Sequence, residues 1–318
     1  MGRRVALALG SGGARGYAHI GVINELRDRG YEIVGVAGSS MGALVGGLCA
    51  AGSLDEFTTW STTLTQRAML RLLDPSISAA GVFRAGKILD AVRDIVGDAT
   101  IESLPIPFTA VTTDLIAGKS VWLQRGPLDE AIRASIAIPG VIAPHVMDGR
   151  MLADGGILDP LPIAPIAAVN ADLTIAVSVS GTEADLGDQL GSDVRPTRER
   201  LNRLLRSTSA LLDKISTVPE SASEIEDDFD VADIEAAEQA ESQFPKLGSF
   251  AIMMRSIDIA QAALARHQMA AYPPDLLIEV PRTACRSLDF HRATEVIELG
   301  HQLAARALDG LEDQPSES

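Results

Sequence analysis

One pentapeptide, G-S-S-M-G at 38–42, constrains this chain more than any other feature. It follows a run rich in Val and Ile and precedes a run of small apolar residues, which predict a buried strand and a helix. A G-x-S-x-G in that context holds its serine on a sharp turn, with the hydroxyl exposed above the sheet. Ser40 is therefore a candidate nucleophile, and Gly38 and Gly42 are the glycines that permit the turn.

The same order of strand, turn and helix occurs at the beginning of the chain. An apolar run at 5–9 leads into a glycine-rich turn at 10–16, and residues 17–29 have apolar side chains at helical spacing. Two successive units of this kind predict a parallel sheet covered by helices, so the fold class is α/β. Further strands are predicted at 108–113, 120–123, 150–153, 174–179 and 276–280, and helices at 41–51, 128–137, 248–270 and 290–308.

Composition limits the partners of this chain. Its 318 residues carry a formal net charge of −16, and 46% of them are hydrophobic, which is enough for a folded core. Because the negative field repels polyanions, nucleic acid is not expected as a partner. The uncharged stretch 33–54 is long enough to cross a bilayer, but its glycines favour a buried strand, turn and helix. We expect a cytoplasmic protein without a signal peptide or transmembrane segment.

One part of the chain departs from the alternating pattern. Arginines interleave with leucines at 195–206, which predicts a basic amphipathic helix. Residues 220–245 then hold ten acidic side chains and no Lys or Arg, so a solvated segment is expected there. We interpret 183–247 as an acidic insertion, disordered or lid-like, in a single domain of residues 4–310. The remainder, 311–318, is expected to be a disordered tail.

The first glycine-rich turn reads G-S-G-G-A-R-G and ends its strand at the same sheet edge as Ser40. Consecutive amides of Gly12 and Gly13 can form a nest that binds an anion. A dinucleotide-binding fingerprint is the weaker hypothesis. Arg15 stands where its third glycine belongs, and the following strand ends without the acid that binds a ribose.

A serine nucleophile needs a base, and none of the five histidines lies in a recognisable catalytic pattern. His19, His291 and His301 fall in predicted helices, where partly buried structural roles are expected. His145 lies in a loop after a proline and is the reserve candidate for the base.

A carboxylate is the alternative base. The sequence D-G-G ends the strand predicted at 150–153, and Gly155 and Gly156 allow another backbone to approach closely. A carboxylate accepts a serine proton when desolvation raises its basicity, so Asp154 is the first candidate. An ordinary Asp-Gly turn without chemistry is the simpler interpretation of this motif in isolation. No metal ligands of usable spacing are present.

The three motifs, in this order, resemble those of the patatin-like phospholipases. The resemblance is closest to small bacterial members similar to the esterase domain of neuropathy target esterase. It extends to D-E-A-I-R-A-S-I-A-I-P-G at 129–140 and covers most of residues 4–182 and 248–309. One departure is Ser11, where many relatives have a glycine.

The resemblance implies a three-layer α/β/α patatin-like fold with a mainly parallel central sheet. It also implies a serine esterase or lysophospholipase-type lipid acyl hydrolase that needs no cofactor. Ser40 and Asp154 would form a Ser-Asp dyad, with Gly12 and Gly13 as the oxyanion hole and Arg15 supporting their loop.

The expected partners are a lipid or acyl-ester substrate and a transiently contacted membrane surface. Residues 57–73 and 195–218 mix apolar with cationic side chains and are candidate lid segments. An acyltransferase or thioesterase on the same acyl-serine, and a lipid-binding regulator without turnover, remain alternative functions.

Overall fold

The computed structural model describes residues 2–65, 86–181 and 249–313. The chain divides into two compact units, Met1–Gln189 with Arg255–Ser318, and Leu190–Met254. Of the second unit only residues 249–254 are described, and they begin a helix. The predicted insertion at 183–247 lies outside the described residues and stays a prediction.

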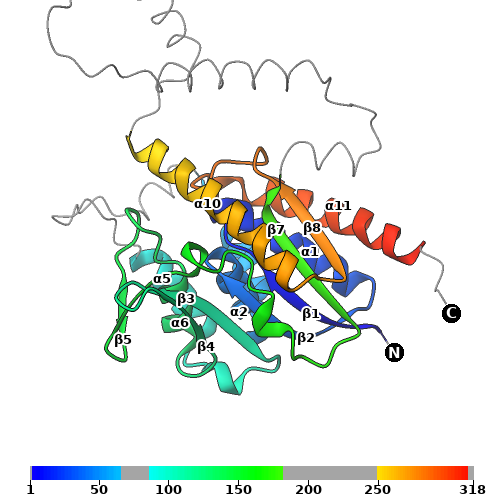
Figure 1. Ribbon diagram of the computed structural model, residues 1–318. Helices are drawn as coiled ribbons and strands as arrows, with labels where there is room; N and C mark the ends of the chain where they lie inside the picture. Colours follow the sequence, from blue (N-terminus) through cyan, green and yellow to red (C-terminus); the bar gives the residue numbers. More distant parts are fainter. Residues whose placement is uncertain (1, 66–85, 182–248, 314–318) are drawn as a thin grey trace, which may run out of the picture. The chain divides into compact units, whose positions relative to one another are not determined.

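One sheet of eight strands organises the first unit, in the order β5-β6-β3-β2-β1-β7-β8, with β4 also paired to β3 (Figure 1). Its parallel strands are β1 (Arg4–Leu9), β2 (Glu32–Ser39), β3 (Phe108–Asp114), β7 (Leu173–Gly181) and β8 (Leu276–Pro281). Its antiparallel strands are β4 (Lys119–Leu123), β5 (His145–Met147) and β6 (Arg150–Asp154). The prediction of a mainly parallel α/β sheet is confirmed, and among the described strands only the short β5 was not predicted from the sequence.

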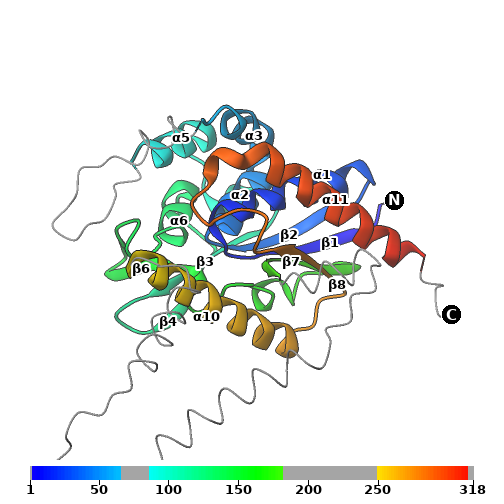
Figure 2. The same cartoon turned by 90° about the horizontal axis from the view of Figure 1, so that it is seen from above.

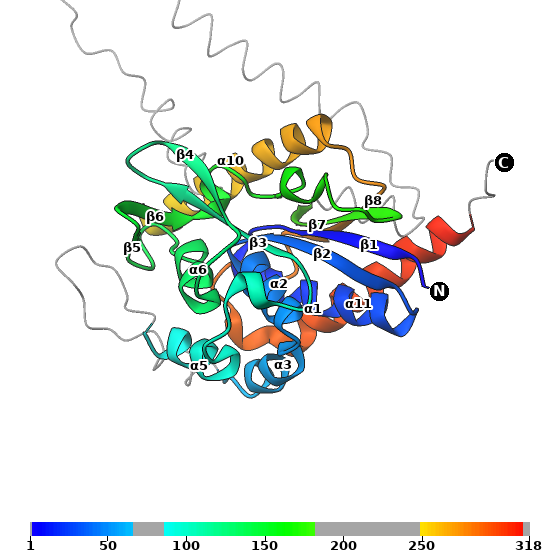
Figure 3. The same ribbon diagram turned by 90° about the horizontal axis from the view of Figure 1, so that it is seen from below.

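Helices cover both faces of this sheet, which gives the expected three layers (Figures 2 and 3). One face carries α1 (Ala18–Asp28), α2 (Met41–Ala51), α3 (Leu54–Thr62), α5 (Gly86–Val96), α6 (Leu128–Ser135) and α11 (Ala293–Glu312). The other carries α10 (Ser249–Ala271). Short 3-10 turns are η1 (Gly13–Tyr17), η2 (Ile101–Ser103), η3 (Gly155–Ile157), η4 (Ala164–Ile166) and η5 (Phe290–Arg292). The larger core cluster lies between the sheet and the first group of helices.

The uncharged stretch 33–54 forms β2, a tight turn and α2, as predicted. Its strand and helix are almost entirely buried against other parts of the first unit. Among the described residues, no helix is both long enough and apolar enough to cross a membrane.

The C-terminal helix runs past the boundary predicted for a disordered tail. Helix α11 ends at Glu312, and the hydroxyl of Tyr31 donates a hydrogen bond of 3.0 Å to the Glu312 carboxylate. Arg29 forms an ion pair with the same carboxylate at 3.4 Å. The prediction that the tail begins at 311 was wrong, because these contacts hold the last turn against the end of α1; residues 314–318 lie outside the described part.

The two edges of β3 determine where the candidate residues Ser40 and Asp154 meet. Strand β4 pairs with Ala110–Asp114 along one edge, so β2 and β6 must share the other edge. Strand β2 pairs along it from Phe108 to Val111, and β6 pairs from Thr112 to Asp114. The end of β2 therefore abuts the end of β6, and Ser40, which follows Ser39, meets Asp154.

Helices α1 and α11 cross at a point where glycine is required. A Cβ atom added to Gly300 would lie 2.1 Å from the carbonyl oxygen of Ala18, and one added to Gly21 would lie 2.0 Å from that of Ile297. Side chains at these two positions would force the helices apart and disturb the core beside them.

We predict that Gly300→Ala destabilises the protein by roughly 1–3 kcal/mol, because the added methyl group overpacks a backbone contact. Gly310→Ala is the matched control on the same helix, since no atom lies within 4 Å of its added Cβ. That variant should gain about 0.5–1 kcal/mol from helix propensity. Urea unfolding measures both changes, and equal stabilities for the two variants would contradict the tight crossing.

Candidate active site

Ser40 occupies a strained turn between β2 and α2. It is one of two non-glycine residues with positive φ among the described residues, with φ 56° and ψ −123°. Its amide donates a hydrogen bond of 2.9 Å to Ser135 Oγ, which in turn donates one of 2.6 Å to the carbonyl oxygen of Val111. Strain of this kind persists only where the surroundings fix the backbone, and here Ser135 ties the turn to β3.

The glycines on either side of Ser40 allow strand and helix to pack tightly. A Cβ atom on Gly38 would lie 2.2 Å from the carbonyl oxygen of Gly42, and one on Gly42 would lie 2.1 Å from that of Leu9. The sharp turn predicted for the pentapeptide is therefore present, and it lies against the end of β1.

Asp154 ends β6 and faces Ser40. The Ser40 hydroxyl donates a hydrogen bond of 2.5 Å to Asp154 Oδ2, and the amide of Gly156 donates one of 2.7 Å to Oδ1. A Cβ on Gly155 would lie 2.2 Å from the carbonyl oxygen of Val111, so both glycines of the D-G-G sequence lie within this junction. The carboxylate thus has one oxygen held by backbone and the other directed at the serine.

Burial sets the basicity of this carboxylate. Asp154 is only 3% exposed, and the loss of hydration raises its pKa to about 6, although the hydrogen bonds from Ser40 and Gly156 act in the opposite direction. Desolvation disfavours the charged form of an acid, so the ionised group is a stronger base than an aspartate in water.

The histidines lie elsewhere. His145 is in β5 with its Nε2 atom 2.5 Å from Glu130 Oε2, so the structure brings Asp154 and not this reserve candidate to Ser40. His19 is fully buried instead of partly buried, and its Nε2 atom lies 2.8 Å from the carbonyl oxygen of Gly10. Burial lowers the pKa of His19 to about 4, which keeps it neutral.

The first glycine-rich turn lies beside Ser40. Three amides of the turn donate hydrogen bonds to backbone carbonyl oxygens: Gly10 to Val177 at 3.0 Å, Ser11 to Pro160 at 2.8 Å, and Ala14 to Ser287 at 2.9 Å. The N–H groups of Gly12 and Gly13 are left without a hydrogen-bond partner in the described part of the chain. Gly13 has φ +58°, and a Cβ there would lie 2.2 Å from the Ser287 carbonyl oxygen, so glycine is required.

Arg15 supports this loop from within the protein. Its side chain is 4% exposed, and its Nε donates a hydrogen bond of 3.2 Å to the carbonyl oxygen of Gly12. Its Nη2 donates to Asp258 Oδ1 at 2.8 Å and to Ser287 Oγ at 3.1 Å. Sequence analysis identified Arg15 but not its two partners.

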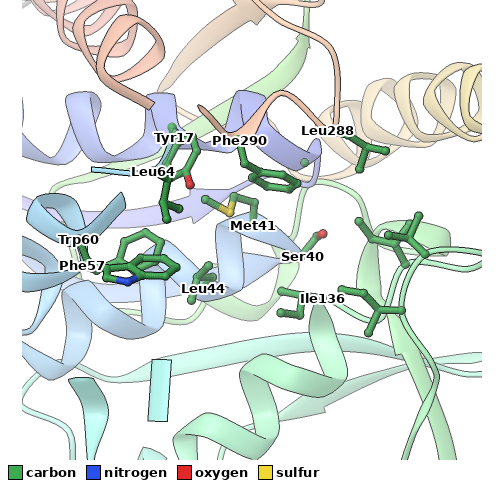
Figure 4. Close-up of a pocket in the computed structure, with 14 residues that line it drawn as sticks. Tyr17, Ser40, Met41, Leu44, Phe57, Trp60, Leu64, Ile136, Leu288 and Phe290 are labelled. Carbon is green, nitrogen blue, oxygen red and sulfur yellow. The ribbon is translucent and has the colours of Figure 1, made fainter. Parts of the chain in front are cut away.

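An apolar pocket opens beside the serine (Figure 4). Figure 4 shows Ser40 between Met41 and Ile136, with the ring of Phe290 on the Met41 side. The described residues that line it are Gly13, Tyr17, Ser40, Met41, Leu44, Phe57, Trp60, Leu64, Ile136, Ile138, Val141, Ile142, Leu288 and Phe290. Ser40 is thus a polar group at the wall of a pocket lined almost wholly by hydrocarbon.

The candidate lid at 57–73 is described only as far as residue 65. Phe57 and Trp60 belong to α3, and their rings pack on each other with centroids 5.7 Å apart. Phe57 is 1% exposed, and it lines the pocket together with Trp60 and Leu64. The second candidate lid, at 195–218, lies outside the described residues.

Comparison with known proteins settles the family. Residues 7–167 match the patatin-like phospholipase family. The chain belongs to this family. An uncharacterized NTE family protein of Mycobacterium tuberculosis, strain H37Rv, is 62% identical over 340 residues, which cover 99% of this chain and 94% of that protein.

More distant relatives extend the comparison. Neuropathy target esterase sws of Drosophila melanogaster is 34% identical over 200 residues, which cover 59% of this chain and 14% of that protein. The crystal structure of VipD from Legionella pneumophila matches with a TM-score of 0.45 and 13% identity, covering 97% of this chain and 67% of that one. Membership of the patatin-like phospholipase and NTE family implies a lipid acyl hydrolase.

One group in the described part of this patatin-like protein has ligand atoms close enough to hold a metal ion. It consists of Glu25, Asp28 and His301, whose ligand atoms lie within 4.8 Å of one another on α1 and α11. Glu25 is already paired with Arg29 at 2.6 Å, and none of the three lines the pocket beside Ser40. The group is best explained as part of the ion pairs between the two helices.

We predict that ester hydrolysis by this patatin-like protein loses kcat/KM as pH falls through about 6, the pKa of Asp154. The sign follows because only the ionised carboxylate can accept the serine proton. Rates measured with a neutral ester between about pH 4.5 and pH 8 should fall about tenfold per pH unit on the acid side. His145→Ala is the control and should keep the same inflection; its loss in that variant would assign the base to His145.

Proposed function

We propose that this patatin-like protein is a serine esterase that hydrolyses lipid acyl esters with Ser40 as nucleophile and Asp154 as base. The observation that carries the proposal is the buried hydrogen bond of 2.5 Å from the Ser40 hydroxyl to Asp154 Oδ2. It lies at the wall of an apolar pocket and beside the amides of Gly12 and Gly13, which have no hydrogen-bond partner among the described residues. The groups proposed as nucleophile, base, oxyanion donors and acyl site thus lie next to one another, which supports the proposal.

Acylation begins with attack of Ser40 Oγ on the ester carbonyl carbon. Asp154 Oδ2 takes the hydroxyl proton as the new C–O bond forms, and the carbonyl electrons move to the oxygen. The tetrahedral intermediate then collapses and breaks the bond to the leaving alcohol, which receives the proton from Asp154. The products of this half-reaction are a free alcohol and an acyl ester on Ser40.

Deacylation repeats these steps with water. Asp154 accepts a proton from a water molecule as the water oxygen attacks the acyl carbon. Asp154 then returns the proton to Ser40 Oγ as the carboxylic acid leaves. The amide of Gly156 on Oδ1 keeps the carboxylate oriented while its other oxygen carries the proton.

The amides of Gly12 and Gly13 are proposed to bind the oxygen that becomes negative in both steps. Preorganised donors of this kind act on charge that develops only in the transition state, so each contributes roughly 10² to 10³ in rate. Ser40 also lies at the N-terminus of α2, where the helix dipole favours negative charge.

The pocket favours an acyl chain as the bound part of the substrate. Its described lining includes Leu44, Phe57, Trp60 and Val141, and the Ser40 hydroxyl is among its few polar atoms. Burying a hydrocarbon chain there gains about 0.8 kcal/mol per CH₂ group, so esters of longer chains should react at lower KM than esters of short ones.

We predict that Ser40→Ala and Asp154→Asn each lower p-nitrophenyl ester turnover by at least about a thousandfold. The first removes the proposed nucleophile, and the second removes the base that accepts its proton. Ser39→Ala and Asp148→Asn are the matched controls. Ser39 has a buried hydroxyl without a hydrogen-bond partner among the described residues, and Asp148 is exposed in the β5–β6 turn. Both should keep wild-type rates.

Thermal unfolding of the same four variants separates lost chemistry from lost structure. Asp154→Asn should be at least as stable as wild type at neutral pH, because it removes a buried charge. Turnover that survives Asp154→Asn in a folded protein would overturn the proposed base, and turnover that survives Ser40→Ala would overturn the proposed nucleophile.

A further inference from the structure

We propose that Asp258, on α10, is a positioning residue for the reaction of Ser40. It fixes the guanidinium of Arg15 so that the glycine turn presents the Gly13 N–H to the oxyanion. This inference rests on the proposed esterase function and assigns a part in it to a helix that carries none of the sequence motifs.

Arg15 joins three segments that are distant in the sequence. One guanidinium bonds the Gly12 carbonyl oxygen through Nε, and Asp258 and Ser287 through Nη2. Asp258 lies on α10, and Ser287 lies between β8 and α11. The arginine is therefore held from two sides while it holds the glycine turn.

The bond to Gly12 matters because of the geometry of the peptide unit. The Gly12 carbonyl and the Gly13 N–H belong to one planar trans peptide, so they point in opposite directions. When Arg15 fixes the oxygen on the protein side, the N–H is directed away from it, and Gly13 lines the same pocket as Ser40. A charged donor on the carbonyl also polarises the peptide and strengthens its N–H as a donor.

Asp258 supplies the charge that a buried guanidinium requires. The Arg15 side chain is 4% exposed and that of Asp258 is 25% exposed, with 2.8 Å between Nη2 and Oδ1. Removal of one partner of such a pair leaves the other charge uncompensated. Without Asp258, Arg15 is expected to move toward solvent or another acceptor and to release the Gly12 oxygen.

The Ser287 hydroxyl donates a long hydrogen bond of 3.5 Å to Asp258 Oδ2, whereas the Ser287 carbonyl holds the turn through backbone contacts. It accepts the Ala14 amide at 2.9 Å and lies against Gly13. The turn is therefore expected to remain folded when Asp258 is replaced and to lose only the precise direction of the Gly13 N–H. Because the oxyanion is absent from the bound substrate and forms only during the reaction, the loss should appear in kcat and not in KM.

The test compares the full chain carrying Asp258→Ala, Asp258→Asn, Arg15→Ala and the Asp258→Ala/Arg15→Ala pair, with p-nitrophenyl butyrate as substrate. Asp258→Ala should lower kcat roughly 10- to 100-fold at nearly unchanged KM, part of the cost of a lost oxyanion donor. Asp258→Asn keeps an acceptor oxygen without the charge and should lose less. In the double variant, Asp258→Ala should add almost nothing to the effect of Arg15→Ala, because both act on the same peptide.

Ile259→Ala is the matched control on the same helix. Ile259 is 56% exposed and adjacent to Asp258, so its replacement should leave kcat and KM unchanged. A wild-type kcat in Asp258→Ala, or multiplicative effects in the double variant, would overturn the positioning role. If Asp258→Ala unfolds, Asp258→Asn takes its place, and a wild-type kcat in that variant would overturn the positioning role.

The outcomes also separate this inference from the proposed function. If Ser40→Ala abolishes turnover while Asp258→Ala and Asp258→Asn behave as wild type, only the positioning role fails. If the wild type neither turns over the ester nor reacts with a fluorophosphonate, the esterase proposal fails and this inference fails with it.

Discussion

The hydrogen bond between the Ser40 hydroxyl and Asp154 Oδ2 is the interaction on which the proposed chemistry depends. It joins two strands that approach each other end to end along one edge of β3. Strand β2 runs parallel to β3, and β6 runs antiparallel to it. The C-terminal ends of these two strands therefore face each other. A fully parallel sheet would have carried Asp154 to a different place, and the mixed sheet is therefore a condition for the proposed dyad.

Two unfavourable features are concentrated at this junction. Ser40 has a positive φ of 56°, and Asp154 is a carboxylate buried to 97%. Both features cost stability, and both are required by the proposed chemistry. The turn places the hydroxyl at the pocket, and burial raises the pKa of the carboxylate. The surrounding structure offsets these costs through the Ser135 bridge to β3, the Gly156 amide and the tightly packed glycines.

Much of this arrangement could be predicted from local sequence. Strand and helix periodicity located most of the strands, and the glycines at 38, 42 and 155 marked places where backbones approach within about 2 Å of an added Cβ. The choice between Asp154 and His145 could not be made from residues alone, because it depends on which strands share the edge of β3. Asp258 gave no signal, since one acid on a helix becomes significant only when Arg15 lies opposite it. The end of α11 at Glu312 was also not predicted, because it depends on a contact with Tyr31, which is distant in the sequence.

The most direct test of this account is to locate the covalent adduct that forms with a fluorophosphonate. Peptide mapping by mass spectrometry after labelling identifies the residue that carries the phosphonyl group, independently of any choice of ester substrate. The account predicts a single adduct on Ser40 that forms much more slowly in folded Asp154→Asn protein. An adduct on another residue, or none in the folded wild type, would contradict the assignment of Ser40 as an activated nucleophile.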